Sequence, residues 1–199
     1  HIAEEESTLD EKFRIKQSIQ DNSRYEYWKR MEFKKNEWEQ IIQRAKSHGL
    51  SFICSIFSEK AIDILSQMSI DAWKLGSGEF WSEDLIEKLI ETKLPILIST
   101  GMSSWSEIDS VNQKLSDKKS NFAIMHCCSE YPTPLQDVGL NIIDEMMNKY
   151  DCPIGFSDHS AKPIVSKLAI MKGISILEIH VTFNRDLYGP DSTSSLTFD

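Results

Sequence analysis

The chain has 199 residues, of which 40% are hydrophobic and 27% are charged, the usual balance of a soluble globular domain. Its formal net charge of −9 argues against a nucleic-acid-binding surface, because phosphate contacts require clustered lysine and arginine side chains. No apolar run is long enough to cross a membrane, and the opening stretch HIAEEESTLDEKF is acidic and polar, unlike a signal peptide.

Residues 1–33 are charged and lack a regular apolar pattern, so we expect an irregular excursion with one short helix. A rhythm of amphipathic stretches and short apolar runs begins at residue 34. The amphipathic stretches predict helices over 36–49, 58–69, 82–93, 103–117, 138–150 and 161–173. The apolar runs predict strands over 50–57, 72–79, 94–101, 121–128, 152–160 and 175–183.

Strands that alternate with helices predict right-handed βαβ units and a parallel sheet covered on both faces. An open doubly wound sheet would gather its polar strand ends at one switch point. Here nearly every predicted strand ends in polar residues or glycine, as in a (β/α)8 barrel. We therefore expect an α/β fold in which residues 34–199 form a partial (β/α)8 TIM barrel. The first two strands would lie upstream, and residues 1–33 would precede the third.

The four cysteines are Cys54, Cys127, Cys128 and Cys152, and they show neither a CxxC motif nor a zinc-binding spacing. The adjacent pair cannot readily bridge itself in a regular strand. We therefore expect reduced thiols in a cytoplasmic protein.

Two histidines, His159 and His180, end consecutive predicted strands. Neighbouring strands lie about 5 Å apart, so two imidazoles at this edge could share one divalent cation. The other interpretation is a pair of hydrogen-bonded histidines near the surface. A third histidine, His126, lies within a predicted strand and is better explained as a core residue or as a histidine that supports the site without touching a ligand.

Small and hydroxylated residues follow two other predicted strands. In KLGSGE, Lys74 supplies charge and the residues after it allow backbone N–H groups to approach an anion. A glycine turn beside an exposed lysine is an equally good interpretation. In STGM, Ser99 and Thr100 could simply cap a helix. Tyr131 could line a sugar pocket or be structural, and Asp191 in GPD has the features of a turn residue.

Five motifs taken in order resemble the N-acetylneuraminate (sialic acid) synthase family: WKLGSGE, PILISTGMSSWSEI, MHCCSEYPTPLQDVGLN, IGFSDHS and LEIH…GPDSTSSL. The resemblance runs from about residue 34 to the end, and YWKRMEF at 27–33 extends it. It implies a barrel that condenses phosphoenolpyruvate with an N-acetylated hexosamine, such as N-acetylmannosamine. The product is a nine-carbon 2-keto sugar acid, and phosphate is released. A divalent metal, Mn²⁺ or Mg²⁺, assists, and the complete enzyme is a homodimer.

The resemblance also implies site residues. His159 and His180 hold the metal and, with Glu79, count as catalytic residues. The phosphate end of phosphoenolpyruvate is bound by Ser55, Lys74 and Ser77. Its carboxylate is faced by Ser99, Ser129 and Ser157. The sugar is contacted by Glu79, Tyr131 and Asp191.

The chain departs from the family pattern at several points. Ile179 stands where the family has a basic residue, and Ser129 stands where it often has asparagine. The first two strands, with a glutamate and a Lys-Phe-Gln stretch, are absent from the sequence. So is a C-terminal antifreeze-like domain, which gives an arginine to the sugar pocket of the partner subunit. The sequence does not choose among sialic, legionaminic and pseudaminic acid substrates.

Two alternatives stay open. One is an aldolase or lyase barrel, metal-dependent or forming a Schiff base, for which Lys74 is the best candidate. The other is a sugar-binding relic of the synthase that does not turn over.

Overall fold

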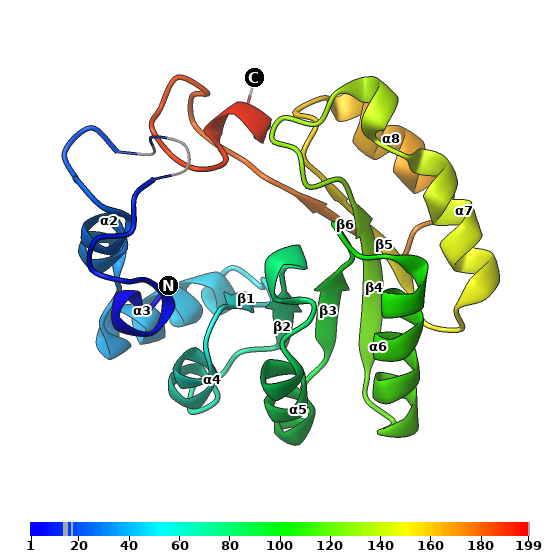
Figure 1. Ribbon diagram of the computed structural model, residues 1–199, viewed down its shortest axis with the longest axis horizontal. Helices are drawn as coiled ribbons and strands as arrows, with labels where there is room; N and C mark the ends of the chain where they lie inside the picture. Colours follow the sequence, from blue (N-terminus) through cyan, green and yellow to red (C-terminus); the bar gives the residue numbers. More distant parts are fainter. Residues whose placement is uncertain (14–15, 17, 199) are drawn as a thin grey trace. The chain divides into compact units, whose positions relative to one another are not determined.

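The computed structural model describes residues 1–13, 16 and 18–198. Its strands form a six-stranded sheet whose order follows the chain, β1-β2-β3-β4-β5-β6 (Figure 1). The predicted alternation of strands and helices is therefore confirmed. Contacts divide the chain into two compact units, His1–Ile96 and Leu97–Asp199. Among the helices described, none has the length and apolar character needed to span a bilayer.

The first unit contains two strands of the sheet, the helices that precede them and the helix that follows each of them. Its helices are α1 (Ala3–Glu6), α2 (Arg24–Met31), α3 (Lys35–Ser47), α4 (Glu59–Leu65) and α5 (Glu83–Thr92). The strands β1 (Ile53–Ile56) and β2 (Ala72–Leu75) pair in parallel, and a 3-10 turn, η1 (Ser77–Glu79), follows β2. The described part of residues 1–33 thus holds two helices, α1 and α2, rather than the single one expected. The Ser23 side chain begins α2 by accepting a hydrogen bond from the Glu26 amide.

The second unit carries the rest of the sheet, from β3 (Ile96–Ser99), which begins at the boundary. The other strands are β4 (Phe122–Cys127), β5 (Ile154–Asp158) and β6 (Ile176–Ile179), and β5 pairs in parallel with both β4 and β6. The helices are α6 (Trp105–Asp117), α7 (Leu140–Lys149) and α8 (Pro163–Met171), and the 3-10 turns are η2 (Leu135–Asp137) and η3 (Ser192–Ser194). Helices α7 and α8 pack against β5, and α8 also contacts β6 (Figure 1).

One position at the centre of β5, Gly155, has little space for a side chain. A Cβ on Gly155 would lie 3.0 Å from the Ile176 carbonyl oxygen and 3.0 Å from Cγ of Met125. The neighbours Met125 and Phe156 are almost fully buried, so the packing here leaves little room for adjustment. Glycine thus lets β4, β5 and β6 approach one another closely just before the strands reach their polar ends.

Side chains alternate between two faces after Gly155, and this alternation decides which polar groups meet. Asp158 turns toward α8, where its carboxylate accepts hydrogen bonds from the Ser166 hydroxyl (2.5 Å) and the Ser160 amide (2.8 Å). Ser157 and His159 turn to the opposite face. The Asp158 carboxylate therefore anchors the end of β5, and it faces away from the imidazole of His159, the next residue in sequence.

Candidate active site

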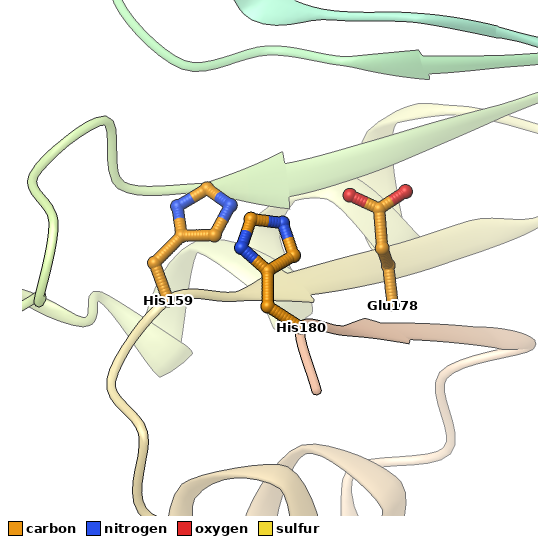
Figure 2. A group of neighbouring side chains, drawn as sticks. All are labelled: His159, Glu178 and His180. Atoms are coloured by element: carbon orange, nitrogen blue, oxygen red, sulfur yellow. The ribbon is translucent and has the colours of Figure 1, made fainter. Parts of the chain in front are cut away.

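Two histidines and a glutamate gather where β5 and β6 end. One ligand atom from each of His159, Glu178 and His180 lies within 4.8 Å of the others. The two imidazole centroids are 5.1 Å apart, and Figure 2 shows the rings next to each other with the Glu178 carboxylate nearby. The register of β5 against β6 explains the grouping, because Ser157 pairs with Glu178. The residues two positions later, His159 and His180, face the same way as this pair.

His159 is held in one orientation by the backbone. Its Nδ1 lies 2.8 Å from the Cys128 carbonyl oxygen, which can only accept, so Nδ1 carries the proton. This leaves the Nε2 lone pair facing the cluster, where it lies 3.1 Å from the Ser157 hydroxyl and 3.3 Å from the Tyr131 hydroxyl. Burial lowers the pKa of His159, and the neighbouring His180 lowers it further, which favours the neutral imidazole that a metal requires.

The loop after β4 brings Tyr131 to the cluster. Two hydrogen bonds join the loop to His159, one on each side of Tyr131. The Thr133 amide donates to the His159 carbonyl oxygen (3.0 Å), and His159 Nδ1 donates to the Cys128 carbonyl oxygen. The Tyr131 ring consequently stacks on the His159 ring at a centroid distance of 4.1 Å. Burial raises the pKa of the Tyr131 hydroxyl, so this group is neutral and can donate a hydrogen bond.

His180 and Asp191 form the other side of the cluster. Their nearest side-chain atoms, Nδ1 and Oδ1, are 3.9 Å apart. Among the described residues, the buried Nδ1 of His180 has no hydrogen-bond partner. A buried polar atom without a partner is costly, and its position beside a carboxylate suits a ligand that the polypeptide does not supply.

The cluster has the chemistry of a divalent cation site. Two imidazoles and one carboxylate are a common ligand set for borderline divalent metals. Ser157 supports it by donating to Glu178 Oε1 (2.7 Å), a contact that orients the carboxylate as outer partners do in metal sites. The residues present therefore fit a divalent cation, which His159, Glu178 and His180 would hold.

Sequence reasoning placed two of these three residues and missed the role of Glu178. Glu178 is separated from His180 by one residue, as Ser157 is from His159. The two-residue period of a strand places both members of such a pair on one face. That signal was present in the sequence, but it becomes specific only once the β5–β6 register is known.

The other predicted residues of the second unit lie around the ends of its strands. Ser157 is buried within the cluster, and Ser99 is buried at the end of β3. Ser129 lies half-buried in the loop between Cys128 and Tyr131. Ile179 pairs with Asp158 and is 40% exposed, on the face opposite Glu178 and His180.

The predicted residues of the first unit lie on β1, on β2 and just after β2. Ser55 and Lys74 pair across the two strands. Lys74 is buried, with its exposed fraction at 7%, whereas Ser55 is exposed and lines a cavity of about 260 Å³. The alternative of an exposed lysine beside a glycine turn is therefore wrong. Ser77 and Glu79 are half-buried in η1.

Glu79 sits in an environment that favours its neutral form. Burial raises the pKa of its carboxyl, and the Glu6 carboxylate adds to the shift, while Lys74 and Arg24 oppose it. A Cβ on Gly76 would lie 3.1 Å from Glu79 Oε2, so the glycine makes room for the carboxylate. His126, by contrast, is half-buried, forms a hydrogen bond from Nε2 to the Val138 carbonyl oxygen and stacks near Phe156, which fits the core interpretation.

The sequence is similar to curated proteins that are named as sugar-acid synthases. The chain is 31% identical over 180 residues to N,N'-diacetyllegionaminic acid synthase of Legionella pneumophila, covering 88% of this chain and 51% of that protein. It is 31% identical to N-acetylneuraminate-9-phosphate synthase of Drosophila melanogaster, covering 83% of this chain and 45% of that protein. The chain thus spans about half the length of these curated relatives.

A solved structure with a similar fold is also named as a sugar-acid synthase. The N-acetylneuraminic acid (sialic acid) synthetase of Leptospira borgpetersenii, in complex with citrate, superimposes with a TM-score of 0.83 at 31% identity. The match covers 87% of this chain and 61% of that one. The sequence model of the NeuB family matches residues 2–199. The chain therefore belongs to the NeuB family.

Proposed function

We propose that the full-length protein condenses phosphoenolpyruvate with an N-acetylated hexosamine to a nine-carbon 2-keto sugar acid of the sialic acid type. The observation that carries this proposal is the cluster of His159, Glu178 and His180 at the strand ends of a NeuB-family chain. The relatives are named as synthases of legionaminic acid and of N-acetylneuraminate 9-phosphate, which supports a sugar-acid product.

The proposed fold of the full-length protein is a (β/α)8 barrel in which the six strands are the third to the eighth. A parallel sheet whose strand order follows the chain is what such a barrel requires, and its sites are built at the carboxyl ends of strands. In this proposal residues 1–33 precede the third strand, and residues 34–199 belong to the barrel. The protein is expected to act as a homodimer, by the family resemblance.

The reaction has a simple balance. C3 of phosphoenolpyruvate forms a bond to the aldehyde carbon of the sugar, whose oxygen takes up a proton. Water adds to C2, and the bond between C2 and the phosphate oxygen breaks as phosphate leaves. A divalent cation, Mn²⁺ or Mg²⁺, would supply Lewis-acid polarisation of the aldehyde. His159, Glu178 and His180 are the residues that would hold it.

The remaining residues are assigned to substrate binding by the family resemblance. Ser55, Lys74 and Ser77 are proposed to bind the phosphate end, and Ser99, Ser129 and Ser157 the carboxylate end, of phosphoenolpyruvate. Glu79, Tyr131 and Asp191 are proposed to contact the sugar. The pKa of Glu79 is raised by burial, which is the direction that a role in proton transfer requires. The buried ammonium group of Lys74 suits an anionic substrate.

The test is phosphate release by the full-length protein with phosphoenolpyruvate, Mn²⁺ and N-acetylmannosamine or the legionaminic and pseudaminic acceptor sugars. We expect activity with one acceptor, loss of activity with EDTA, and loss in His159→Ala and His180→Ala. His48→Ala is the matched control, because His48 is exposed at the end of α3. Full activity in either site variant would overturn the metal assignment, and binding of an acceptor without any turnover would favour a sugar-binding relic.

The burial of Lys74 favours one second candidate, a Schiff-base aldolase or lyase. Such an enzyme would be trapped covalently by borohydride in the presence of pyruvate, and Lys74→Met would prevent trapping. A synthase of the proposed type would give no adduct at Lys74.

A further inference from the structure

Arg185 connects the turn after β5 to the segment after β6. These two segments lie on opposite sides of the cation cluster, the group formed by His159, Glu178 and His180. Its Nε donates a hydrogen bond to the Ser195 carbonyl oxygen (2.9 Å), and a terminal guanidinium nitrogen donates to the Ala161 carbonyl oxygen (3.0 Å). Ala161 follows β5 and lies two residues after His159, whereas Ser195 lies in the segment that carries Asp191. One planar side chain thus joins the turn after β5 to the segment after β6.

The Ala161 end of this connection is conformationally strained. Ala161 has a φ of 56°, in the left-handed region that residues with a Cβ seldom adopt. Such conformations persist only where surrounding contacts hold them. The hydrogen bond from Arg185 is one such contact, and Ala161 is itself buried.

The Ser195 end is joined to both His180 and Asp191. The Ser195 hydroxyl donates to the Asp191 carbonyl oxygen (2.8 Å), and the next amide, that of Leu196, donates to the His180 carbonyl oxygen (2.8 Å). A shift of Ser195 would therefore move the backbone of both site residues.

We propose that Arg185 is a positioning residue that sets the distance between His159 and the side of the cluster formed by His180 and Asp191. Its two donors form a rigid fork, so the two carbonyl oxygens are held at a fixed separation. The inference rests on the proposed function for the identity of the cation. It predicts an effect on cation affinity without any direct contact between Arg185 and the cation.

The test is direct binding of Mn²⁺, without substrates, to the full-length protein, measured from the electron paramagnetic resonance signal of free Mn²⁺. Arg185→Met removes both donors and keeps the aliphatic stem, and we expect Mn²⁺ to bind about 10-fold more weakly, the lower end of the loss found when groups that orient metal ligands are removed. Arg185→Lys keeps the charge with a single donor group, so an intermediate loss is expected. Arg30→Met is the matched control, because Arg30 pairs with Asp21 on the surface of the first unit.

A rescue variant separates positioning from general stability. Adding Ala161→Gly to Arg185→Met removes the cost of the positive φ, so part of the lost Mn²⁺ affinity should return. Wild-type affinity in Arg185→Met, with only a lower urea midpoint, would overturn the inference and leave the proposed function intact. If Arg185→Met does not fold, equal Mn²⁺ affinity in Arg185→Lys and the wild type would overturn it. A wild-type protein that binds no Mn²⁺ would overturn both the inference and the cation site.

Discussion

The Tyr131 ring lies on the His159 ring, with centroids 4.1 Å apart and planes inclined by 23°. The Tyr131 hydroxyl is also 3.3 Å from His159 Nε2, the atom that faces the cation cluster. One tyrosine therefore has two separable contacts with the same histidine. The stacking contact fixes the ring plane, and the hydroxyl contact is available to a ligand that approaches Nε2.

Replacing Tyr131 should separate these two contacts. Tyr131→Phe keeps the ring and loses the hydroxyl, so we expect kcat/KM for the acceptor sugar to fall about 5-fold, the value of one hydrogen bond of about 1 kcal/mol. Tyr131→Ala also loses the stacking and should lower it further. Steady-state kinetics with each substrate varied in turn would measure this. A fall confined to KM for phosphoenolpyruvate would contradict the assignment of Tyr131 to the sugar.

Replacing Glu178 should weaken cation binding. Glu178→Gln keeps an acceptor for the Ser157 hydroxyl but removes the negative charge and the preferred oxygen ligand. We expect Mn²⁺ to bind at least about 10-fold more weakly, with little change in the unfolding midpoint. Glu145→Gln, at an exposed position on α7, is the matched control. Calorimetric titration would show the difference, and unchanged affinity would remove Glu178 from the ligand set.

Cys54 gives a prediction that depends on pH. Burial raises the pKa of its thiol to about 11. Because the thiolate is the reactive form, alkylation of Cys54 in the folded protein should be very slow at pH 8 and should accelerate as the pH approaches 11. Iodoacetamide labelling followed by peptide mass spectrometry would measure it, with urea-unfolded protein as the reference. Equal labelling of folded and unfolded protein at pH 8 would show that Cys54 is not shielded.

The alternation of elements was predictable because strands and helices have different apolar periods. Each predicted strand contains an observed one, but the observed strands are shorter: residues 152–160 were expected, and β5 spans Ile154–Asp158. At the carboxyl end of β5 the extra residues are the polar His159 and Ser160, and His159 belongs to the site. Local hydrophobicity marks the apolar run, and tertiary hydrogen bonds decide where pairing stops.

The site was predictable only in part. His159 and His180 follow from strand ends and from the family resemblance, whereas Glu178 needed the register of β5 against β6. Asp158 lies beside His159 in sequence but faces α8, where Ser166 binds it. Arg185 could not be found from sequence, because it acts on two backbone carbonyl oxygens that no side-chain pattern identifies.

Gly155 provides a test of the packing that supports the site. A methyl group at this position would lie 3.0 Å from both the Ile176 carbonyl oxygen and Cγ of Met125, closer than carbon atoms normally approach. Gly155→Ala should therefore lower the free energy of unfolding by about 1–3 kcal/mol, the usual cost of overpacking a core. Urea denaturation of the full-length protein, followed by tryptophan fluorescence, would measure the loss.

A second glycine serves as the control for this change. Gly78 has no heavy atom within 4 Å of an added Cβ, and its φ is not positive, so Gly78→Ala should change the unfolding free energy by less than about 1 kcal/mol. The comparison separates crowding from the general effect of replacing glycine. Equal stability of the two variants would mean that β5 can move away from β6. In that case the β5–β6 spacing that brings His159 and His180 together would not depend on this glycine.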